Sequence, residues 1–287
     1  GDEVIVPDIT WVSTANAVML VGGTPIFADV DIDTWTIDPK SVESLINEKT
    51  KAIMPVHLYG HPAKMDDIMA LATKYNLKII EDAAPSIGAE FNEQKTGSFG
   101  DFSAFSFQGA KLLVTGEGGM LCTNDEDLYK RAYKIWDQGR VPGTFWIEEL
   151  SSKYKMANIQ AAIGVAQMSK IDSIIAKKKW IASEYNKHLR SLKGVTLPPN
   201  MEWADNVFWL YTILVDFNRN KLMTKFKKNG IDSRPVFYPI HTQPIYQNGL
   251  VLPVSEKISN CGISLPSSPN LNGEDILKIC RIIKSVT

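Results

Sequence analysis

Short β-rich runs alternate with helical patterns through the first half of this 287-residue chain, and this alternation constrains the fold more than any other feature. A helical pattern starts at Pro39 after Asp38, and another repeats apolar residues every three or four positions from Met65 to Tyr75. Strand–helix alternation is typical of a largely parallel sheet with helices on both faces, so we expect an α/β fold. The β-rich runs are residues 3–6, 25–29, 52–56, 78–81, 102–107 and 119–123.

The second half of the chain predicts a smaller unit of the same kind. Residues 158–192 have a long helical pattern that allows a break, and glycine and two prolines end it. We therefore expect a large α/β domain in residues 1–175, then a linking helix and a small C-terminal α/β domain in residues 176–287. The elements expected in the small domain are a strand at 207–215, a basic helix at 219–228 and an amphipathic helix at 274–286.

Residues 103–111, Ser-Ala-Phe-Ser-Phe-Gln-Gly-Ala-Lys, and the Thr-Gly-Glu-Gly-Gly-Met at 115–120 carry the strongest functional signal. The alternating run predicts a strand that brings Ser106 and Lys111 into a glycine-rich turn. Glycine lets the backbone approach a ligand closely, and serine hydroxyls and loop amides suit a phosphate. A lysine there is either a phosphate clamp or an amine that forms a Schiff base. On this segment alone, a surface lysine in a polar turn is the simpler interpretation.

A second segment favours a functional role for Lys111 over a surface lysine. Residues 77–84, Leu-Lys-Ile-Ile-Glu-Asp-Ala-Ala, predict a short strand that ends in two acids. An Asp at the carboxyl end of a parallel strand lies where open α/β sheets bind ligands, although Asp82 alone would be interpreted as a cap or turn residue. Pyridoxal phosphate (PLP) needs a Schiff-base lysine, a carboxylate on its pyridinium nitrogen and a phosphate cradle. Lys111, Asp82 and Ser106 supply one of each.

These two segments resemble the DegT/DnrJ/EryC1/StrS family of sugar aminotransferases, and the likeness runs over nearly the whole chain. Within the family, residues 33–39 and 57–62 are most similar to the GDP-perosamine synthase branch. The resemblance implies a fold type I PLP-dependent transferase, with a mostly parallel sheet flanked by helices and a smaller C-terminal α/β domain. Further family-like segments follow in order at 10–16 (Thr-Trp-Val-Ser-Thr-Ala-Asn), 56–62 (Val-His-Leu-Tyr-Gly-His-Pro), 158–164 (Asn-Ile-Gln-Ala-Ala-Ile-Gly) and 234–241 (Arg-Pro-Val-Phe-Tyr-Pro-Ile-His).

The resemblance also implies the role of each cofactor-binding residue. Lys111 would hold PLP and move the proton between cofactor and substrate carbon, Asp82 would pair with the ring nitrogen, and Ser106 would bond the phosphate. Trp11 occupies the position that stacks on the pyridine, while on physical grounds core packing is an equal interpretation. Lys153 aligns with a position, often Asn, that reaches the phosphate from the neighbouring subunit. Without the resemblance, Lys153 would be a solvated lysine.

Substrate binding is implied for Arg234, Tyr238 and His241, which lie in a proline-punctuated segment that helps the family bind its nucleotide sugar. An arginine suits a diphosphate because its planar fork pairs two oxygens at once. A surface arginine beside a rigid proline turn is the alternative. Ala110 stands where the perosamine pattern has Asn, and this departure bears on the exact sugar.

We therefore expect a PLP-dependent aminotransferase that moves an amino group from glutamate onto a nucleotide-linked 4-keto-6-deoxy sugar. A 3-keto sugar aminotransferase of the same family and a non-catalytic sugar-nucleotide-binding relative are the alternatives. Lys111 argues against the deoxygenating branch of the family, in which His replaces the Schiff-base lysine. The family builds its active sites at a two-fold interface, so the resemblance implies a homodimer with shared sites.

The start of the chain also departs from the family. Gly1 leads directly into a predicted strand, whereas family members carry several tens of residues before this point, including a Gly-Thr-containing loop that contacts the cofactor phosphate. We therefore expect the sequence to be a fragment of a longer chain, with a large domain that is incomplete at its N-terminus.

Composition bears on partners and location. Lys and Arg (31) nearly balance Asp and Glu (32), so charge does not argue for nucleic acid or membrane, and no apolar run reaches membrane-spanning length. Cys122, Cys261 and Cys280 have neither CxxC spacing nor an even count, which predicts reduced thiols of a cytoplasmic protein without a leader. His57 and His61 lie in a strand-like segment followed by proline, so we expect no metal site.

Overall fold

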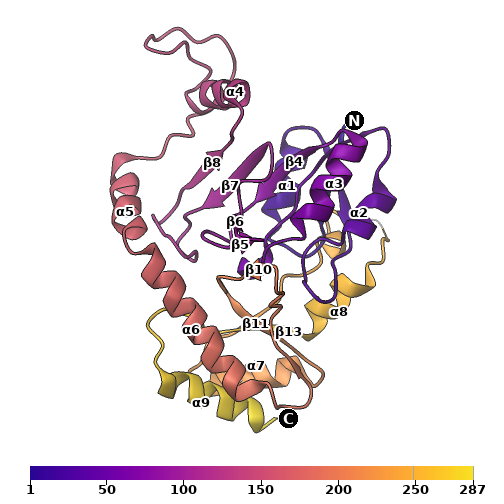
Figure 1. The fold of residues 1–287 in the computed structure, drawn as a ribbon, viewed down its shortest axis with the longest axis vertical. Helices are drawn as coiled ribbons and strands as arrows, with labels where there is room; N and C mark the ends of the chain where they lie inside the picture. Colours follow the sequence, from indigo (N-terminus) through magenta and orange to yellow (C-terminus); the bar gives the residue numbers. More distant parts are fainter. Residues whose placement is uncertain (248, 287) are drawn as a thin grey trace.

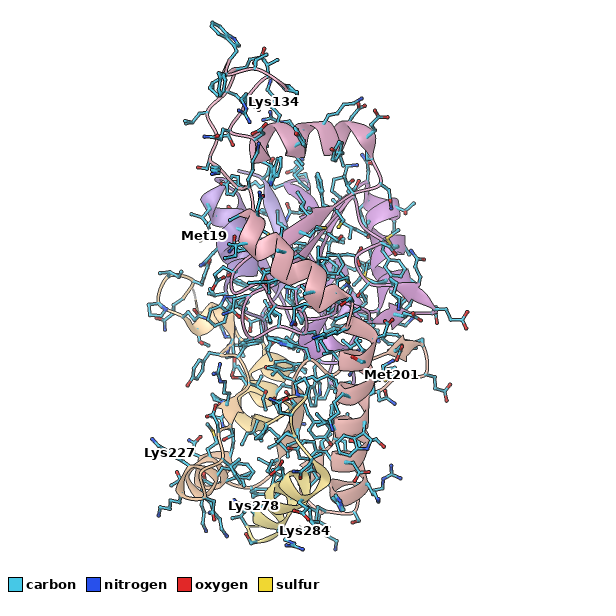
Figure 2. All side chains as sticks on the ribbon, turned by 90° about the vertical axis from the view of Figure 1, so that its left-hand side faces the viewer. Met19, Lys134, Met201, Lys227, Lys278 and Lys284 are labelled. Atoms are coloured by element: carbon cyan, nitrogen blue, oxygen red, sulfur yellow. The ribbon has the colours of Figure 1, made fainter. Side chains whose placement is uncertain are left out.

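The structure is a computed structural model that describes residues 1–247 and 249–286. Figure 1 shows an elongated molecule with a large sheet and its helices towards one end and a smaller α/β unit at the other. Helix α6 (Ile171–Leu189) runs along one side and links the two. In Figure 2, Lys227, Lys278 and Lys284 mark the end of the small unit, and Lys134 marks the opposite end of the molecule.

The large sheet has five strands parallel to one another and one antiparallel strand at its edge. This arrangement confirms the predicted α/β class. The run expected at residues 52–56 begins two residues earlier and ends three residues earlier than predicted, and the other five form within one residue of the predicted ends. Across the sheet the strands are β2 (Thr24–Ala28), β1 (Glu3–Pro7), β3 (Thr50–Ile53), β4 (Lys78–Asp82), β7 (Phe102–Ser106) and β8 (Gly119–Cys122).

Helices cover both faces of the large sheet. Neighbouring residues of a strand point to opposite faces, so one strand packs against helices on both sides. Ile5 packs in the core shared by α2 (Pro39–Leu45) and α3 (Met65–Tyr75). Val6, the next residue, packs with α1 (Ser13–Leu20) on the other face. Both predicted helices form, and α3 has the predicted bounds.

The predicted helical stretch at 158–192 is two helices, α5 (Asn158–Met168) and α6, with the break at residues 169–170. Helix α4 (Glu126–Trp136) precedes them and was not predicted. The expected domain boundary between residues 175 and 176 falls inside α6. Ile174 and Ile175 pack with residues of the large domain, and Ile181 packs in the core of the small sheet. The boundary itself stays a prediction.

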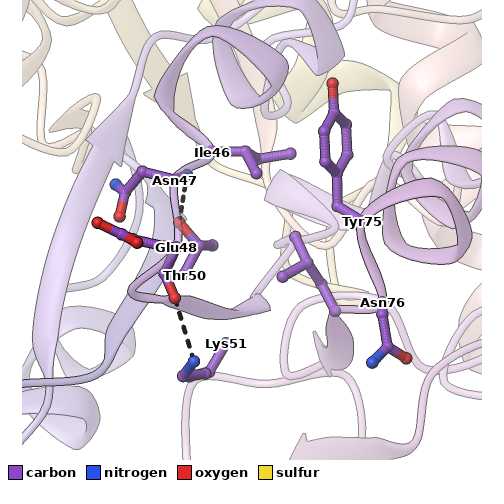
Figure 3. Close-up of a pocket in the computed structure, with 8 residues that line it drawn as sticks. Ile46, Asn47, Glu48, Thr50, Lys51, Tyr75 and Asn76 are labelled. Carbon is purple, nitrogen blue, oxygen red and sulfur yellow. Dashed lines mark hydrogen bonds between the residues drawn. The ribbon is translucent and has the colours of Figure 1, made fainter.

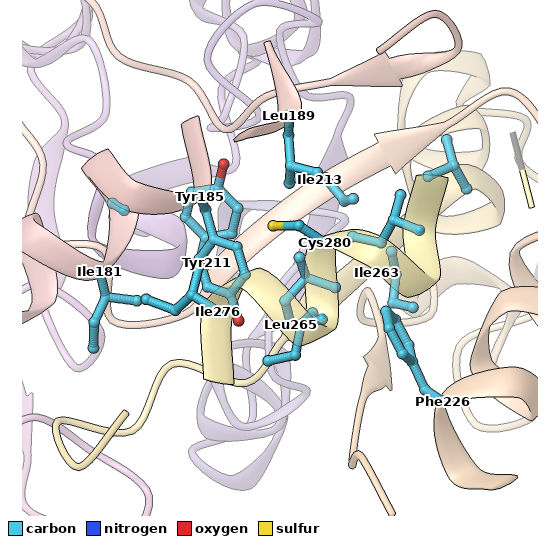
Figure 4. Packing of buried hydrophobic residues seen from close by; sticks show 14 of the residues in the cluster. Ile181, Tyr185, Leu189, Tyr211, Ile213, Phe226, Ile263, Leu265, Ile276 and Cys280 are labelled. Atoms are coloured by element: carbon cyan, nitrogen blue, oxygen red, sulfur yellow. The ribbon is translucent and has the colours of Figure 1, made fainter. Parts of the chain in front are cut away.

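The small sheet is antiparallel, and its core is filled by α6 and two further helices (Figure 4). Tyr185 of α6 stacks on Tyr211 of the sheet with ring centroids 4.5 Å apart. In sheet order its strands are β12 (Arg234–Pro235), β13 (Gly262–Leu265), β11 (Tyr211–Val215) and β9 (Val195–Thr196). The two further helices of this core are α7 (Arg219–Lys228) and α9 (Gly273–Lys284), whereas α8 (Pro253–Cys261) packs in a neighbouring core. Helices α7 and α9 were predicted, whereas α8 was not.

The strand predicted at 207–215 is wrong for its first four residues. Phe208 has a φ of +48°, which takes the chain out of the extended conformation. The side chain of Asn206 accepts a hydrogen bond from the Phe208 amide at 2.7 Å and holds this turn. The chain becomes a strand only from Tyr211.

Smaller elements connect the two parts. Strand β10 (Ala204–Asp205), which follows the linking helix, pairs with β5 (Glu90–Phe91) of the large domain, and β5 pairs in turn with β6 (Gln94–Lys95). Short 3-10 turns lie at Leu58–Gly60 and Ile240–Thr242. None of the helices in the two described ranges is long and apolar enough to cross a membrane.

Candidate active site

Asp82 ends strand β4 at the carboxyl edge of the large sheet, where the sequence predicts it. The hydroxyl of Thr14, in the first turn of α1, donates to Asp82 Oδ2 at 2.8 Å. The Ala84 amide donates to the other oxygen at 3.2 Å. These two donors orient the carboxylate at the edge of the sheet where α/β proteins bind ligands.

Lys111 lies in a closed loop after β7. The loop is held by backbone hydrogen bonds from Phe107 to Gly118 and from Thr115 to Phe107, both at 2.8 Å. Burial lowers the pKa of the Lys111 amine to about 8, and the nearby Asp82 carboxylate opposes this shift. The two side chains are therefore within electrostatic reach of each other. A lysine with a lowered pKa presents more neutral amine, the nucleophilic form, near neutral pH.

Ser106 is the last residue of β7 and stands half-buried at the entry to the same loop. Its Oγ accepts a hydrogen bond from the Gln108 amide at 3.4 Å. The structure thus places Ser106, Lys111 and Asp82 on adjacent strands and the loop between β7 and β8. This donor set fits PLP: an amine of lowered pKa, an oriented carboxylate, and a hydroxyl beside a glycine-rich loop.

Trp11 follows β1 at the same edge, and its side chain is 62% exposed. Its ring centroid lies 6.1 Å from that of Phe237 in the segment after β12. An indole this exposed is not a core residue, which removes the packing interpretation. Its stacking role stays a prediction.

The three predicted substrate-binding residues lie in different environments. Arg234, on the edge strand β12, and Tyr238 are exposed. His241 is buried, and its Nδ1 lies 2.7 Å from Asp8 Oδ2. Its amide donates to the other Asp8 oxygen at 2.9 Å, so His241 joins the end of β1 to the segment after β12. A direct contact between His241 and substrate stays a prediction.

Lys153 lies on an arm, residues 137–154, which projects beyond α4 (Figure 1). Its backbone forms an antiparallel bridge with Asp137, and its side chain is exposed. An ion pair of 2.7 Å between Lys134 of α4 and Glu148 ties the arm to its own helix. Lys153 makes no hydrogen bond or ion pair with Lys111, Asp82 or Ser106 within the described chain.

Two residues of the site were missed by sequence reasoning. Thr14 lies in the family-like segment 10–16, shortly after β1, and this position could have indicated that it belongs to the site. Trp209 packs against Lys111, with Nζ 3.8 Å from the ring centroid. No sequence signal pointed to it, because it stands inside a run that predicts an ordinary strand.

His57 and His61 serve structural purposes. His57 Nε2 lies 3.0 Å from Glu81 Oε2, and the Ala63 amide donates to its Nδ1. His61 Nδ1 lies 2.8 Å from the Pro62 carbonyl oxygen. No group of three or more His, Cys, Asp or Glu side chains is placed to hold a metal ion in residues 1–247 and 249–286.

A surface hollow lies at the opposite edge of the sheet (Figure 3). Thr50 and Leu77 line it. Thr50 begins β3 and Leu77 immediately precedes β4, whereas Asp82 ends β4. The amino ends of parallel strands are not where such sheets bind ligands. This hollow therefore has no part in the site.

The fold and the site together define a class. A largely parallel sheet that carries a lysine of lowered pKa, a carboxylate and a hydroxyl at its carboxyl edge is that of a fold type I PLP-dependent aminotransferase. The sequence matches the DegT/DnrJ/EryC1/StrS aminotransferase family over residues 1–284, and the chain belongs to this family.

Similar proteins agree with this assignment. A GDP-perosamine synthase of Escherichia coli O157:H7 is 42% identical over 287 residues, which cover 99% of this chain and 78% of that protein. A UDP-N-acetyl-3-dehydro-alpha-D-glucosamine 3-aminotransferase of Acidithiobacillus ferrooxidans is 38% identical over 289 residues, covering 99% and 77%. The crystal structure of S. venezuelae DesV matches with a TM-score of 0.94 at 32% identity, covering 99% and 78%. The chain is a PLP-dependent sugar aminotransferase.

Proposed function

We propose that the enzyme transfers an amino group from glutamate to C4 of a nucleotide-linked 4-keto-6-deoxy sugar. The observation that carries the reaction type is Lys111, a partly buried amine of lowered pKa within electrostatic reach of Asp82. The sugar position is supported by the greater identity to the GDP-perosamine synthase than to the 3-aminotransferase. Because both relatives cover the chain almost fully, amination at C3 is the second candidate.

In this mechanism the protein binds, orients and moves protons, while bound PLP supplies the electron sink for negative charge at the substrate carbon. Lys111 would hold the cofactor covalently through Nζ and, once released, carry a proton from one carbon to the other. Asp82, oriented by Thr14, would keep the proton on the pyridine nitrogen. Ser106 and the glycine-rich loop would bind the phosphate.

Substrate binding is assigned to side chains that remain accessible at the same edge. Arg234 would pair with the diphosphate through its planar fork, and Tyr238 would contact the nucleotide sugar. Trp11 would stack on the pyridine ring of PLP. His241 is buried against Asp8, so it would affect substrate binding indirectly, by holding the segment 234–241 in position.

A second copy of the chain would complete the site. The arm exposes large apolar side chains, among them Phe145 at 94% and Trp146 at 72%. Ile159 and Val165 of α5 are each 73% exposed. Monomeric proteins rarely expose so much apolar surface in one region, so we propose a homodimer in which the arm crosses to the partner and places Lys153 near its phosphate. The three cysteines are free thiols, which supports a cytoplasmic location.

The test of function uses enzyme loaded with PLP, glutamate and a panel of GDP-, dTDP- and UDP-linked keto sugars. We expect one panel member to yield a product with a new amino group at C4, located by NMR. Amination at C3 would favour the second candidate instead. Tight sugar-nucleotide binding without product from any panel member would contradict the proposed reaction.

A further inference from the structure

Trp209 contacts both the Lys111 amine and the backbone of Ala110, the residue before Lys111. It belongs to the segment before β11, is 7% exposed, and lies across the domain junction from the loop after β7. Its Nε1–H donates to the carbonyl of Ala110, the residue before Lys111, at 2.7 Å. The face of the same ring lies 3.8 Å from Lys111 Nζ. One indole therefore holds the backbone next to Lys111 and covers the amine of its side chain.

The indole is itself held in place. Lys178 of α6, only 5% exposed, donates from Nζ to the Trp209 carbonyl at 2.6 Å and to the Ser267 carbonyl at 2.5 Å. Burying an ammonium costs free energy unless acceptors compensate, so this lysine marks a strongly specified position. The Tyr59 ring also packs against the indole, with centroids 6.3 Å apart.

Few groups compete for the Lys111 amine. Among the described residues, the Asp82 carboxylate is the charge that raises the pKa of this amine. The buried Tyr59 phenol has its pKa raised by burial and stays neutral. Within the described part of the chain Lys111 Nζ makes no hydrogen bond, and it lies against the indole face. An aromatic face attracts a desolvated ammonium, and this attraction offsets part of the cost of burial.

We propose that Trp209 is a positioning residue for Lys111: the indole aims the amine into the site and stabilises its protonated form. This inference rests on the role proposed above for Lys111. The small domain thereby takes part in setting when the amine holds a proton and when it releases one, although the amine itself belongs to the large domain.

The test measures how fast cofactor-free protein captures PLP covalently at a series of pH values, followed by visible absorbance. The midpoint of this profile reports the proton affinity of the capturing amine. In Trp209→Leu, which keeps an apolar cover without an aromatic face, we expect the midpoint to fall by about one pH unit. Trp209→Phe keeps a weaker face, so its midpoint should fall by about half as much and serves if the Leu variant does not fold. A midpoint that stays unchanged or rises in the variants overturns the proposal.

Two controls distinguish a failure of the role inferred for Trp209 from a failure of the role proposed for Lys111. Trp180, on the surface of α6, also lies under a lysine, with Lys177 Nζ 3.7 Å from its ring. Trp180→Leu should leave the midpoint unchanged; an equal shift there would overturn the proposal. Lys111→Ala should abolish capture. If capture persists in Lys111→Ala with the same midpoint, the assignment of Lys111 fails, and the result for Trp209 concerns another amine.

Discussion

Two lysines of this molecule have similar pKa values and different surroundings. Burial lowers the pKa of both Lys111 and Lys178 to about 8. The Lys178 amine donates to two carbonyl oxygens, whereas the Lys111 amine faces Asp82 and an aromatic ring. A lowered pKa is therefore not enough to mark a reactive lysine; the amine must also lack competing acceptors.

Exchanging each lysine for methionine tests this difference. Lys178→Met leaves two buried carbonyls unpaired, so we expect it to lose about 1–3 kcal/mol of unfolding free energy while keeping the visible band of covalently bound PLP. Lys111→Met should lose the band and turnover with little change in stability. Denaturant unfolding and absorbance spectra measure both. The reverse pattern would reassign the Schiff-base role to Lys178.

Asp82 gives a second prediction at the residue scale. Asp82→Asn keeps the shape of the side chain but removes the charge that holds a proton on the ring nitrogen, so turnover should fall roughly 10²-fold or more. Thr14→Val removes only the hydroxyl that orients Asp82, and its loss should be about fivefold. Steady-state kinetics of both variants measure these losses of turnover. Equal turnover in Asp82→Asn and the parent would exclude the role proposed for Asp82.

His61 predicts how stability depends on pH. Burial lowers the pKa of His61 from 6.5 to about 4, and its Nε2 has no hydrogen-bond partner in the described structure. Since the unfolded chain takes up this proton first, the stabilising contribution is complete above pH 6.5 and is lost as the pH falls towards 4. The total is about 3 kcal/mol. Between pH 6.5 and 4, the unfolding free energy of His61→Phe should therefore fall by about 3 kcal/mol less than that of the parent. If the unfolding free energy of both proteins depended on pH in the same way, this prediction would be contradicted.

At the scale of elements, helix α8 shows why some structure was not predictable. Its own N-cap position offers no side-chain hydrogen bond. Asp29, at the end of β2, instead accepts from the Val254 amide at 3.1 Å and from the Ser255 amide at 2.8 Å. The cap thus comes from a residue more than 220 positions away, which no local pattern contains. By contrast α2, capped by its neighbour Asp38, was predicted.

The strand and site predictions divide in the same way. The placement of Lys111, Ser106 and Asp82 was predictable because two local motifs put Asp82 and Ser106 at the ends of adjacent parallel strands and Lys111 in the loop that follows; their roles stay predictions. Trp209 was not, because its role depends on a contact with Ala110 across the domain junction.

The remote cap predicts unequal costs for two similar substitutions. Asp29→Ala removes the acceptor of the Val254 and Ser255 amides, of the Ser255 hydroxyl and of the neighbouring Val30 amide, so we expect a loss of about 2 kcal/mol of unfolding free energy. Asp38→Ala removes one exposed cap bond and should cost about 1 kcal/mol or less. Thermal or urea unfolding of the pair measures this. Equal losses would show that the remote cap adds nothing beyond an ordinary one.

At the scale of the whole molecule, the exposed arm makes a prediction about shared sites. Light scattering should find a dimer, and a monomer with full activity would refute shared sites. Chains carrying Lys111→Ala and chains carrying Lys153→Ala should each be inactive or weakly active alone. A mixed dimer has one site with both lesions and one with neither, so mixing should restore activity. With subunit exchange confirmed, absence of restoration would place Lys153 outside the partner's site.

The contacts that join the two domains have a consequence for how ligands bind. The Asp8–His241 and Trp209–Ala110 hydrogen bonds and the β5–β10 pairing all lie within the protein itself. Their geometry does not depend on a ligand to draw the halves together. Binding therefore does not have to offset the entropy of ordering one domain against the other. We therefore expect selectivity among sugars to depend more on how well each fits the side chains at the site than on a closing movement of the two domains.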